Sequence, residues 1–259
     1  MVASQVRSPL YYFQLMLCFV KRRVSSMKTY GEFCALSRAL DVVGDRWTML
    51  IIRQLLITPS RYNDIQKSLP GIATNLLAQR LRTLEEHGVV TSTERPAPIS
   101  ARVYELTEWG HGLQTALVGL ARWGAPLLAS GIDGDHSQGR WLVFAIMALY
   151  PDRTEKDLAG LPSLTAAIVA DGDVLLLSSG TDGVTTTLAN TTDTAEVTIE
   201  GTADEVLRTL SGELTNKPKA SIDGSEGALQ RLSQVVRHAN TYGLDLESLK
   251  GHSMASNSG

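Results

Sequence analysis

The segment at residues 71–106 constrains the fold of this chain most strongly. Its first half, TNLLAQRLRTLEEH at 74–87, repeats leucine at helical spacing on one face, and Gly88 follows in a position that often ends a helix. Two short runs of β-forming residues, 89–95 and 102–106, come next, with six residues between them. That connection is too long for a tight turn. The sequence therefore predicts an amphipathic helix followed by a β-hairpin with an extended tip.

Four further helices are predicted around this unit. Residues 34–43 carry apolar side chains at helical spacing, and residues 47–57 are apolar on nearly every side, as expected of a central buried helix. Ser60 can cap a short helix at 61–69, and a long helix begins after Thr107. Two helices joined by a short turn, the second followed by a hairpin, indicate a winged helix-turn-helix.

The second helix of such a unit reads DNA, because its N-terminal part enters the major groove. In this chain that part carries compact side chains that can pair with base edges: Thr74, Asn75 and Gln79. Four arginines, two on the helix and two on the wing, can contact phosphate or guanine: Arg80, Arg82, Arg95 and Arg102. The alternative is that Arg80 and Arg82 are solvated or pair with Glu85 and Glu86. The order of the elements favours binding to double-stranded DNA.

At these residues the chain resembles the HxlR family of bacterial transcriptional regulators, relatives of the MarR type. The resemblance covers residues 27–125 and rests on ALDVVGDRWTMLIIRQLL at 39–56, GIATNLLAQRLRTLEEHGVV at 71–90 and ELTEWG at 105–110. It implies a homodimer whose first and last helices pack together, bound to a palindromic operator. Many relatives have Arg-Val-Glu-Tyr in the wing, whereas here Val-Tyr-Glu follows Arg102. We therefore expect a less secure phosphate contact from Arg102 than from Arg80.

Cys34 matches a cysteine of this family, which in some relatives senses oxidants or electrophiles. Sensing requires an accessible thiol with a lowered pKa, and a position at the start of a helix favours the thiolate. The alternative is that Cys34 is a small buried hydrophobic residue. Because the chain has only two cysteines, no disulfide framework is implied, and a reducing, cytoplasmic location is predicted.

The charge of the chain changes after residue 130. Residues 27–130 carry a net charge of +2 and residues 131–259 a net charge of −9, so the rear part should repel DNA. The low positive charge of the front part predicts that DNA affinity depends on dimerisation. The predicted organisation is an extension at 1–26, a winged helix-turn-helix domain at 27–130, a polar linker at 131–139, a rear domain at 140–250 and a disordered tail at 251–259.

The rear domain is predicted to be an antiparallel sheet with helices, which makes the whole chain α+β. A buried helix at 140–150 comes first, followed by β runs at 164–170, 174–179, 184–188 and 195–199. Thr202 and Glu205 form a capping-box pattern that opens a helix. A strand at 219–223 and a last helix complete the domain.

This order resembles the sterol-carrier-protein-like fold, an α/β sandwich in which a sheet and helices enclose an apolar tunnel. AEVTIEGTADEVLRTLSGEL at 195–214 and KASIDGSEGALQRLSQVV at 219–236 carry the resemblance. It implies a small apolar or lipid-like ligand. The apolar residues predicted to line its pocket are Trp141, Phe144, Leu175, Leu177, Leu207 and Leu210. The alternative for each is plain core, since a domain of this size needs most of its apolar residues for stability.

The first 26 residues differ in character from the rest of the chain. Their apolar run at 10–20 is too short to cross a membrane, which takes about 20 residues. Three of the four positive charges of this segment follow the run, whereas a signal peptide has its positive charge mainly in front. We therefore expect an upstream extension with poor order, with Met27 as the natural start and no membrane association. A short anchoring helix is the alternative.

No motif for catalysis stands out. The sequence lacks a phosphate-binding glycine loop and the CxxC and HExxH spacings of zinc sites, and its five histidines are scattered. We predict no enzyme activity, no metal and no cofactor. The predicted function is a dimeric, sequence-specific transcriptional regulator controlled by a small apolar effector. The alternatives are a lipid-binding protein that uses its front part mainly to dimerise, and a redox-sensing regulator that acts through Cys34.

Overall fold

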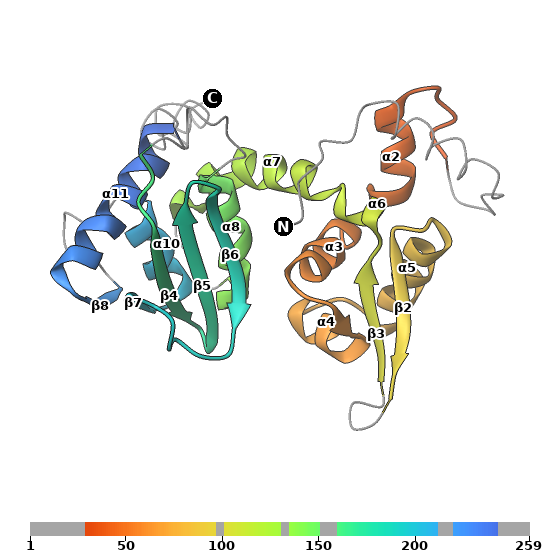
Figure 1. Ribbon diagram of the computed structural model, residues 1–259. Helices are drawn as coiled ribbons and strands as arrows, with labels where there is room; N and C mark the ends of the chain where they lie inside the picture. The colour runs from red at the N-terminus through yellow and green to blue at the C-terminus, as the bar shows by residue number, and fades with distance from the viewer. Residues whose placement is uncertain (1–28, 97–100, 131–134, 151–159, 212–219, 243–259) are drawn as a thin grey trace, which may run out of the picture. The chain divides into compact units, whose positions relative to one another are not determined.

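A computed structural model describes residues 29–96, 101–130, 135–150, 160–211 and 220–242 (Figure 1). The predicted extension at 1–26 and the predicted tail at 251–259 lie outside the described residues. By their internal contacts the residues divide into two units, one up to Asp45 and one from Arg46 onward, and each is described on its own. Within the described ranges, no helix is long and apolar enough to cross a membrane.

Helix α2 (Ala35–Val43) forms in the first unit, one residue shorter than predicted. Cys34 occupies its N-cap position, and the backbone N–H of Gly44 ends it by donating to the carbonyl of Leu40. The hydroxyl of Thr29 and the N–H of Tyr30 both donate to the carboxylate of Asp41, at 2.8 and 2.9 Å. These bonds hold the segment before α2 back against the last turn of the helix.

The second unit begins with the predicted winged helix-turn-helix. Its elements are α3 (Thr48–Ile57), β1 (Ser60–Arg61), α4 (Tyr62–Ser68), α5 (Thr74–Glu86), β2 (Val90–Arg95), β3 (Ala101–Leu106), α6 (Glu108–His111), α7 (Gln114–Gly124) and the 3-10 helix η1 (Ala125–Ser130). The hairpin of β2 and β3 is antiparallel, and β1 adds a short strand on the far side of β3. The single helix expected after Thr107 is instead two, because α6 closes at Gly112, whose N–H donates to carbonyls of α6.

The buried faces of α3 and α5 match the prediction. Ile51, Ile52 and Leu55 of α3 are at most 2% exposed, and so are the three leucines of α5, Leu77, Leu81 and Leu84. The predicted cap at Ser60 is wrong, because Arg61 occupies the N-cap position of α4. The Ser60 hydroxyl instead accepts a hydrogen bond from the buried amide of Gln54, at 3.3 Å. A buried amide needs a partner, which explains why Ser60 turns inward.

A five-stranded sheet with helices follows from Gly139 onward. Its elements are the 3-10 helix η2 (Gly139–Trp141), α8 (Leu142–Leu149), β4 (Leu164–Ala170), β5 (Asp173–Gly180), β6 (Gly183–Ala189), β7 (Val197–Gly201), α10 (Ala203–Leu210), β8 (Ser221–Gly224) and α11 (Glu226–Tyr242). The strand order is β6-β5-β4-β7-β8. The predicted sequence of elements is confirmed, and the chain is α+β.

The expectation of a wholly antiparallel sheet is wrong. Strand β7 pairs with β4 in parallel, from Ala166 opposite Val197 to Ala170 opposite Gly201. Two hairpins place β5 and β6 on one side of β4, so the other edge of β4 is left for β7. The connection at 190–196 then carries the chain back to the level at which β4 begins. The sheet is therefore mixed.

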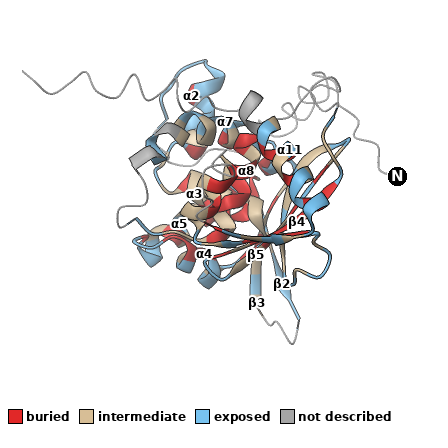
Figure 2. Cartoon of the chain, turned by 90° about the vertical axis from the view of Figure 1, so that its left-hand side faces the viewer, coloured by how far each residue is buried: buried red, intermediate tan, exposed pale blue. Residues whose placement is uncertain are grey.

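The turn between β4 and β5 and the N-terminus of α10 form as the sequence predicts. Asp171 and Gly172 have φ of 49° and 83°, which suits a two-residue hairpin turn between β4 and β5. Thr202 and Glu205 form the predicted capping box of α10. Helix α8 is largely buried (Figure 2), and four of its residues belong to the core cluster between the sheet and the helices: Leu142, Val143, Ile146 and Leu149. The core also contains leucine and isoleucine side chains of β4 and β5, namely Leu164, Ile168, Leu175 and Leu177, and residues of β7, α10 and α11.

Candidate DNA-binding surface

Helix α4 fixes the first turn of α5, the predicted reading helix. The Tyr62 hydroxyl donates to the carbonyl of Thr74 at 2.6 Å, and the Gln66 amide donates to the Thr74 hydroxyl at 2.8 Å. Gly71, with a φ of +93°, makes the bend between the two helices in a conformation that other residues rarely adopt. Sequence reasoning missed Tyr62 and Gln66, because their role depends on how α4 and α5 cross.

The predicted base-contacting residues lie on the exposed side of α5. Thr74, Asn75 and Gln79 are all exposed. At 100° per residue, Asn75, Gln79 and Arg82 share the face opposite the buried leucines. The Asn75 side-chain oxygen accepts the N–H of Leu76 at 2.9 Å, which leaves its amide group as a donor. One face of α5 thus presents two amides and a guanidinium.

The two arginines of α5 differ in their surroundings. Arg82 is exposed, whereas Arg80 is half-buried and lies at the border of the leucine face. Glu85, one of the two carboxylates offered as alternative partners of these arginines, binds Arg102 of the wing. Arg82 is therefore the arginine of α5 that points most fully to solvent.

The two wing arginines also differ. Arg95 is exposed at the end of β2, next to the wing tip at 97–100, which lies outside the described residues. Arg102 lies in β3, and its guanidinium donates to Glu85 at 2.9 Å and to Ser92 at 2.8 Å. The hydrogen bond from Arg102 to Glu85 raises the pKa of Arg102. Arg102 is thus engaged within the protein, which its position in the sequence did not reveal.

Cys34 is exposed, so the alternative of a buried hydrophobic residue is wrong. The backbone N–H of Ser37, with the N–H of Leu36, favours the thiolate and holds the pKa of Cys34 below its ordinary value. The thiol therefore has both properties that sensing requires, exposure and a lowered pKa.

The residues predicted to line a ligand pocket lie in or beside the packed core. Leu175, Leu177 and Leu210 are fully buried, Phe144 is 6% exposed and Leu207 packs against the core from its edge. Trp141 is half-buried and makes an edge-on contact with His136, with 5.6 Å between ring centroids.

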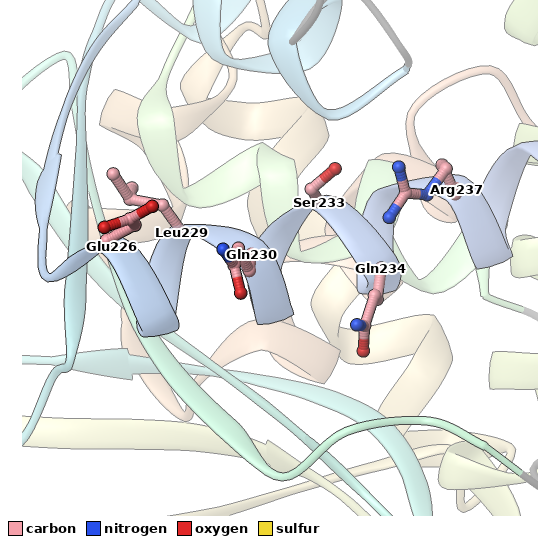
Figure 3. A pocket seen from close by; sticks show the side chains of 6 residues that line it. All are labelled: Glu226, Leu229, Gln230, Ser233, Gln234 and Arg237. Atoms are coloured by element: carbon pink, nitrogen blue, oxygen red, sulfur yellow. The ribbon is translucent and has the colours of Figure 1, made fainter.

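A pocket on the surface of α11 lies elsewhere. Figure 3 shows the side chains that line it, all from this one helix: Glu226, Leu229, Gln230, Ser233, Gln234 and Arg237. Five of these six side chains are polar, and none belongs to the predicted ligand set. Among the described residues, no cluster of His, Cys, Asp and Glu is arranged to hold a metal ion.

Comparisons with known proteins agree with the winged helix-turn-helix. The HxlR-like helix-turn-helix family matches residues 42–130. The chain is 32% identical over 99 residues to sll1512 of Synechocystis sp., an uncharacterised HTH-type transcriptional regulator, covering 38% of this chain and 73% of that one. It is 34% identical over 85 residues to the HTH-type transcriptional regulator YodB of Bacillus subtilis, covering 33% and 76%.

The solved structure of reduced YodB from B. subtilis is 31% identical, covers 39% of this chain and 99% of that chain, and has a TM-score of 0.34. Regulators of this type are DNA-binding proteins and not enzymes. Both sll1512 and YodB are more than 30% identical to this chain, which covers 73% and 76% of their lengths, and these two matches decide the family. This chain belongs to the HxlR-like helix-turn-helix family of transcriptional regulators.

Proposed function

We propose that the protein is a sequence-specific regulator that binds a palindromic operator as a homodimer. The observation that carries this is the exposed face of α5, where Asn75 and Gln79 present amides and Arg82 a guanidinium. Amide side chains pair bidentately with adenine in the major groove, and arginine pairs with guanine or phosphate. Thr74 and Arg80 extend this surface, and Arg95 contacts phosphate from the wing.

The proposed homodimer is supported by exposed apolar side chains in both units. In the first unit Phe33 and Leu36 are exposed, the latter by 67%. In the second unit Leu120 and Trp123, one turn apart on α7, are 53% and 75% exposed. Neighbouring exposed apolar side chains that form a patch mark interaction sites more often than single ones do. A second copy of the chain is the occupant that the family resemblance implies.

Two substitutions test the reading function separately. Gln79→Ala is expected to change which base is preferred at one operator position, by about 1–3 kcal/mol, because a bidentate pair is lost.

Arg95→Gln is expected to weaken binding to all sequences alike and to lower the slope of log affinity against log salt by about one. Fluorescence anisotropy with a panel of operator variants at several salt concentrations measures both. Parent-like binding by both variants would contradict the assignment of α5 and the wing.

The rear domain is proposed to bind a small apolar effector in a sterol-carrier-protein-like fold. The order of elements supports this, since a helix, three strands, a returning strand, a helix, an edge strand and a last helix follow one another. Effector binding would favour one separation of the two recognition helices, which must match half-sites about 34–36 Å apart. Mass spectrometry of organic extracts of the purified protein tests this. If the extract contains no apolar compound, and the purified protein binds none that is added later, the rear domain has no ligand and only stabilises the dimer.

A second candidate function, redox regulation, is favoured by the exposed Cys34 thiol. Its alkylation by iodoacetamide is expected to be half-maximal at a lower pH than that of a free cysteine, whose pKa is about 8.5, because the thiolate persists to lower pH. Peptide mass spectrometry separates this reaction from that of Cys18. A midpoint at or above that of free cysteine, or diamide-sensitive DNA binding that survives Cys34→Ser, would argue against a sensor.

A further inference from the structure

Three polar side chains join the wing to the helix α5. The Ser92 hydroxyl of β2 donates to Glu85 Oε1 at 2.5 Å, and Arg102 Nη2 of β3 donates to the same oxygen at 2.9 Å. Arg102 Nε donates to the Ser92 oxygen at 2.8 Å, which closes a ring of three hydrogen bonds. Each member comes from a different element, so the ring fixes both wing strands to one point of the helix. We call these three residues the wing clamp.

The clamp holds Arg102 on the helix side of the hairpin. Arg102 lies opposite Glu94 in the register of β2 and β3, and its guanidinium carbon is 5.3 Å from the centre of the Tyr104 ring. Because alternate residues of a strand face opposite ways, Ser92, Glu94, Arg102 and Tyr104 share one face of the hairpin, and Arg95 lies on the other. Two carboxylates therefore compensate the charge of Arg102, and two of its donor nitrogens are already used.

We propose that Arg102 and Glu85 are positioning residues that set the angle of the wing to the reading helix, and that Arg102 is not a phosphate contact. This rests on the proposed DNA-binding function and replaces the phosphate contact that the sequence predicted for Arg102. In a complex with DNA, the wing must meet the sugar-phosphate backbone beside the major groove that α5 occupies. Such phosphate contacts fix the register of a protein on the duplex.

Glu85→Ala separates the two roles of Arg102 by the sign of its effect. On charge alone, removing a carboxylate from a DNA-binding surface strengthens binding, and it would free Arg102 for phosphate. The positioning role instead predicts about fivefold weaker binding, the order of one ordinary lost hydrogen bond, because the pair of Arg102 and Glu85 is partly exposed and screened by solvent. Glu86→Ala, one residue further along the same helix, is the matched control and should bind as tightly as the parent or more tightly.

Arg102→Lys supplies the second test. A lysine is an adequate point charge for phosphate, but it lacks the planar fork that spans Ser92 and Glu85. The positioning role predicts that Arg102→Lys weakens binding about as much as Arg102→Ala, with a salt slope close to that of the parent. It also predicts that Glu85→Ala combined with Arg102→Ala binds within about twofold of Arg102→Ala alone, because both break one clamp.

Binding is measured by anisotropy with a labelled duplex taken from directly upstream of the chain's own gene. Parent-like binding by Arg102→Lys, tighter binding by Glu85→Ala, or a salt slope lowered by about one in Arg102→Ala would overturn the proposal.

Amide hydrogen exchange of β2 and β3 without DNA keeps this test independent of the proposed function. Glu85→Ala and Arg102→Lys should each speed exchange in these strands several-fold, and Glu86→Ala should not. If the parent gives no salt-sensitive complex with DNA, the regulator function fails, while exchange still decides whether the clamp holds the wing. Unchanged exchange in both clamp variants would overturn the clamp whatever the DNA result.

Discussion

Replacing Gly110 by alanine is expected to destabilise the winged helix-turn-helix by about 3 kcal/mol. A Cβ at this position would lie 2.1 Å from the carbonyl oxygen of Val89 and 3.1 Å from a methyl group of Leu106. The first of these atoms is backbone at the start of the wing, so it can retreat only if β2 moves. The backbone N–H of Gly110 also donates to the Thr107 hydroxyl at 3.1 Å, which caps α6.

Urea denaturation followed by circular dichroism measures this effect. Gly119→Ala is the matched control, since nothing lies within 4 Å of the place its methyl group would take, and alanine favours a helix over glycine by about 0.5–1 kcal/mol. A Gly110→Ala protein as stable as the parent would mean that α6 does not lie against Val89. DNA affinity should fall with stability, because α6 follows directly from the wing strand β3.

Replacing Leu120 and Trp123 together by lysine is expected to convert a dimer into monomers and to weaken operator binding about a hundredfold. Both side chains are exposed on one face of α7, so the change costs little within a single chain. Charged side chains across an apolar interface oppose association. Loss of the second half-site removes the gain from bivalent binding, which is about 10²–10⁴ in affinity.

Sedimentation and anisotropy measured on the same samples test this expectation. Leu229→Lys, which alters an exposed leucine on α11, is the control and should leave both the oligomeric state and DNA binding unchanged. A double variant that stays dimeric and binds DNA normally would place the interface on another surface. A monomer that still binds with parent affinity would mean that dimerisation is not needed for reading.

Periodic patterns in the sequence predicted where helices and strands lie better than they predicted which strands pair with one another. The leucine face of α5 and the hairpin of β2 and β3 were readable, because each follows from spacing within one segment. The parallel pairing of β7 with β4 was not, because alternation identifies a strand without saying which neighbour it joins. The strand β1 was missed for the same reason, since it has only two residues and is a strand because it pairs with β3.

The same distinction applies to the candidate site. Asn75, Gln79 and Arg82 could be found from the sequence, because helical spacing alone puts them opposite the leucines. The wing clamp could not be predicted from the sequence, because Glu85 and Arg102 are 17 residues apart and meet only when the hairpin folds against α5. The sequence did show that the wing departs from related chains just after Arg102, at Tyr104 and Glu105, and in the structure the Arg102 guanidinium lies over the Tyr104 ring.

The regulator function is tested most simply by a mobility shift with the full chain and DNA from directly upstream of its own gene, at two salt concentrations. We expect a discrete complex that resists unrelated competitor DNA and weakens steeply with salt, since each phosphate contact adds about 0.9 to the salt slope. Gln79→Ala should reduce the resistance to competitor, since discrimination at one operator position is lost, while keeping the salt dependence. A folded dimer that forms no complex with this or other genomic DNA at low salt would contradict the regulator function.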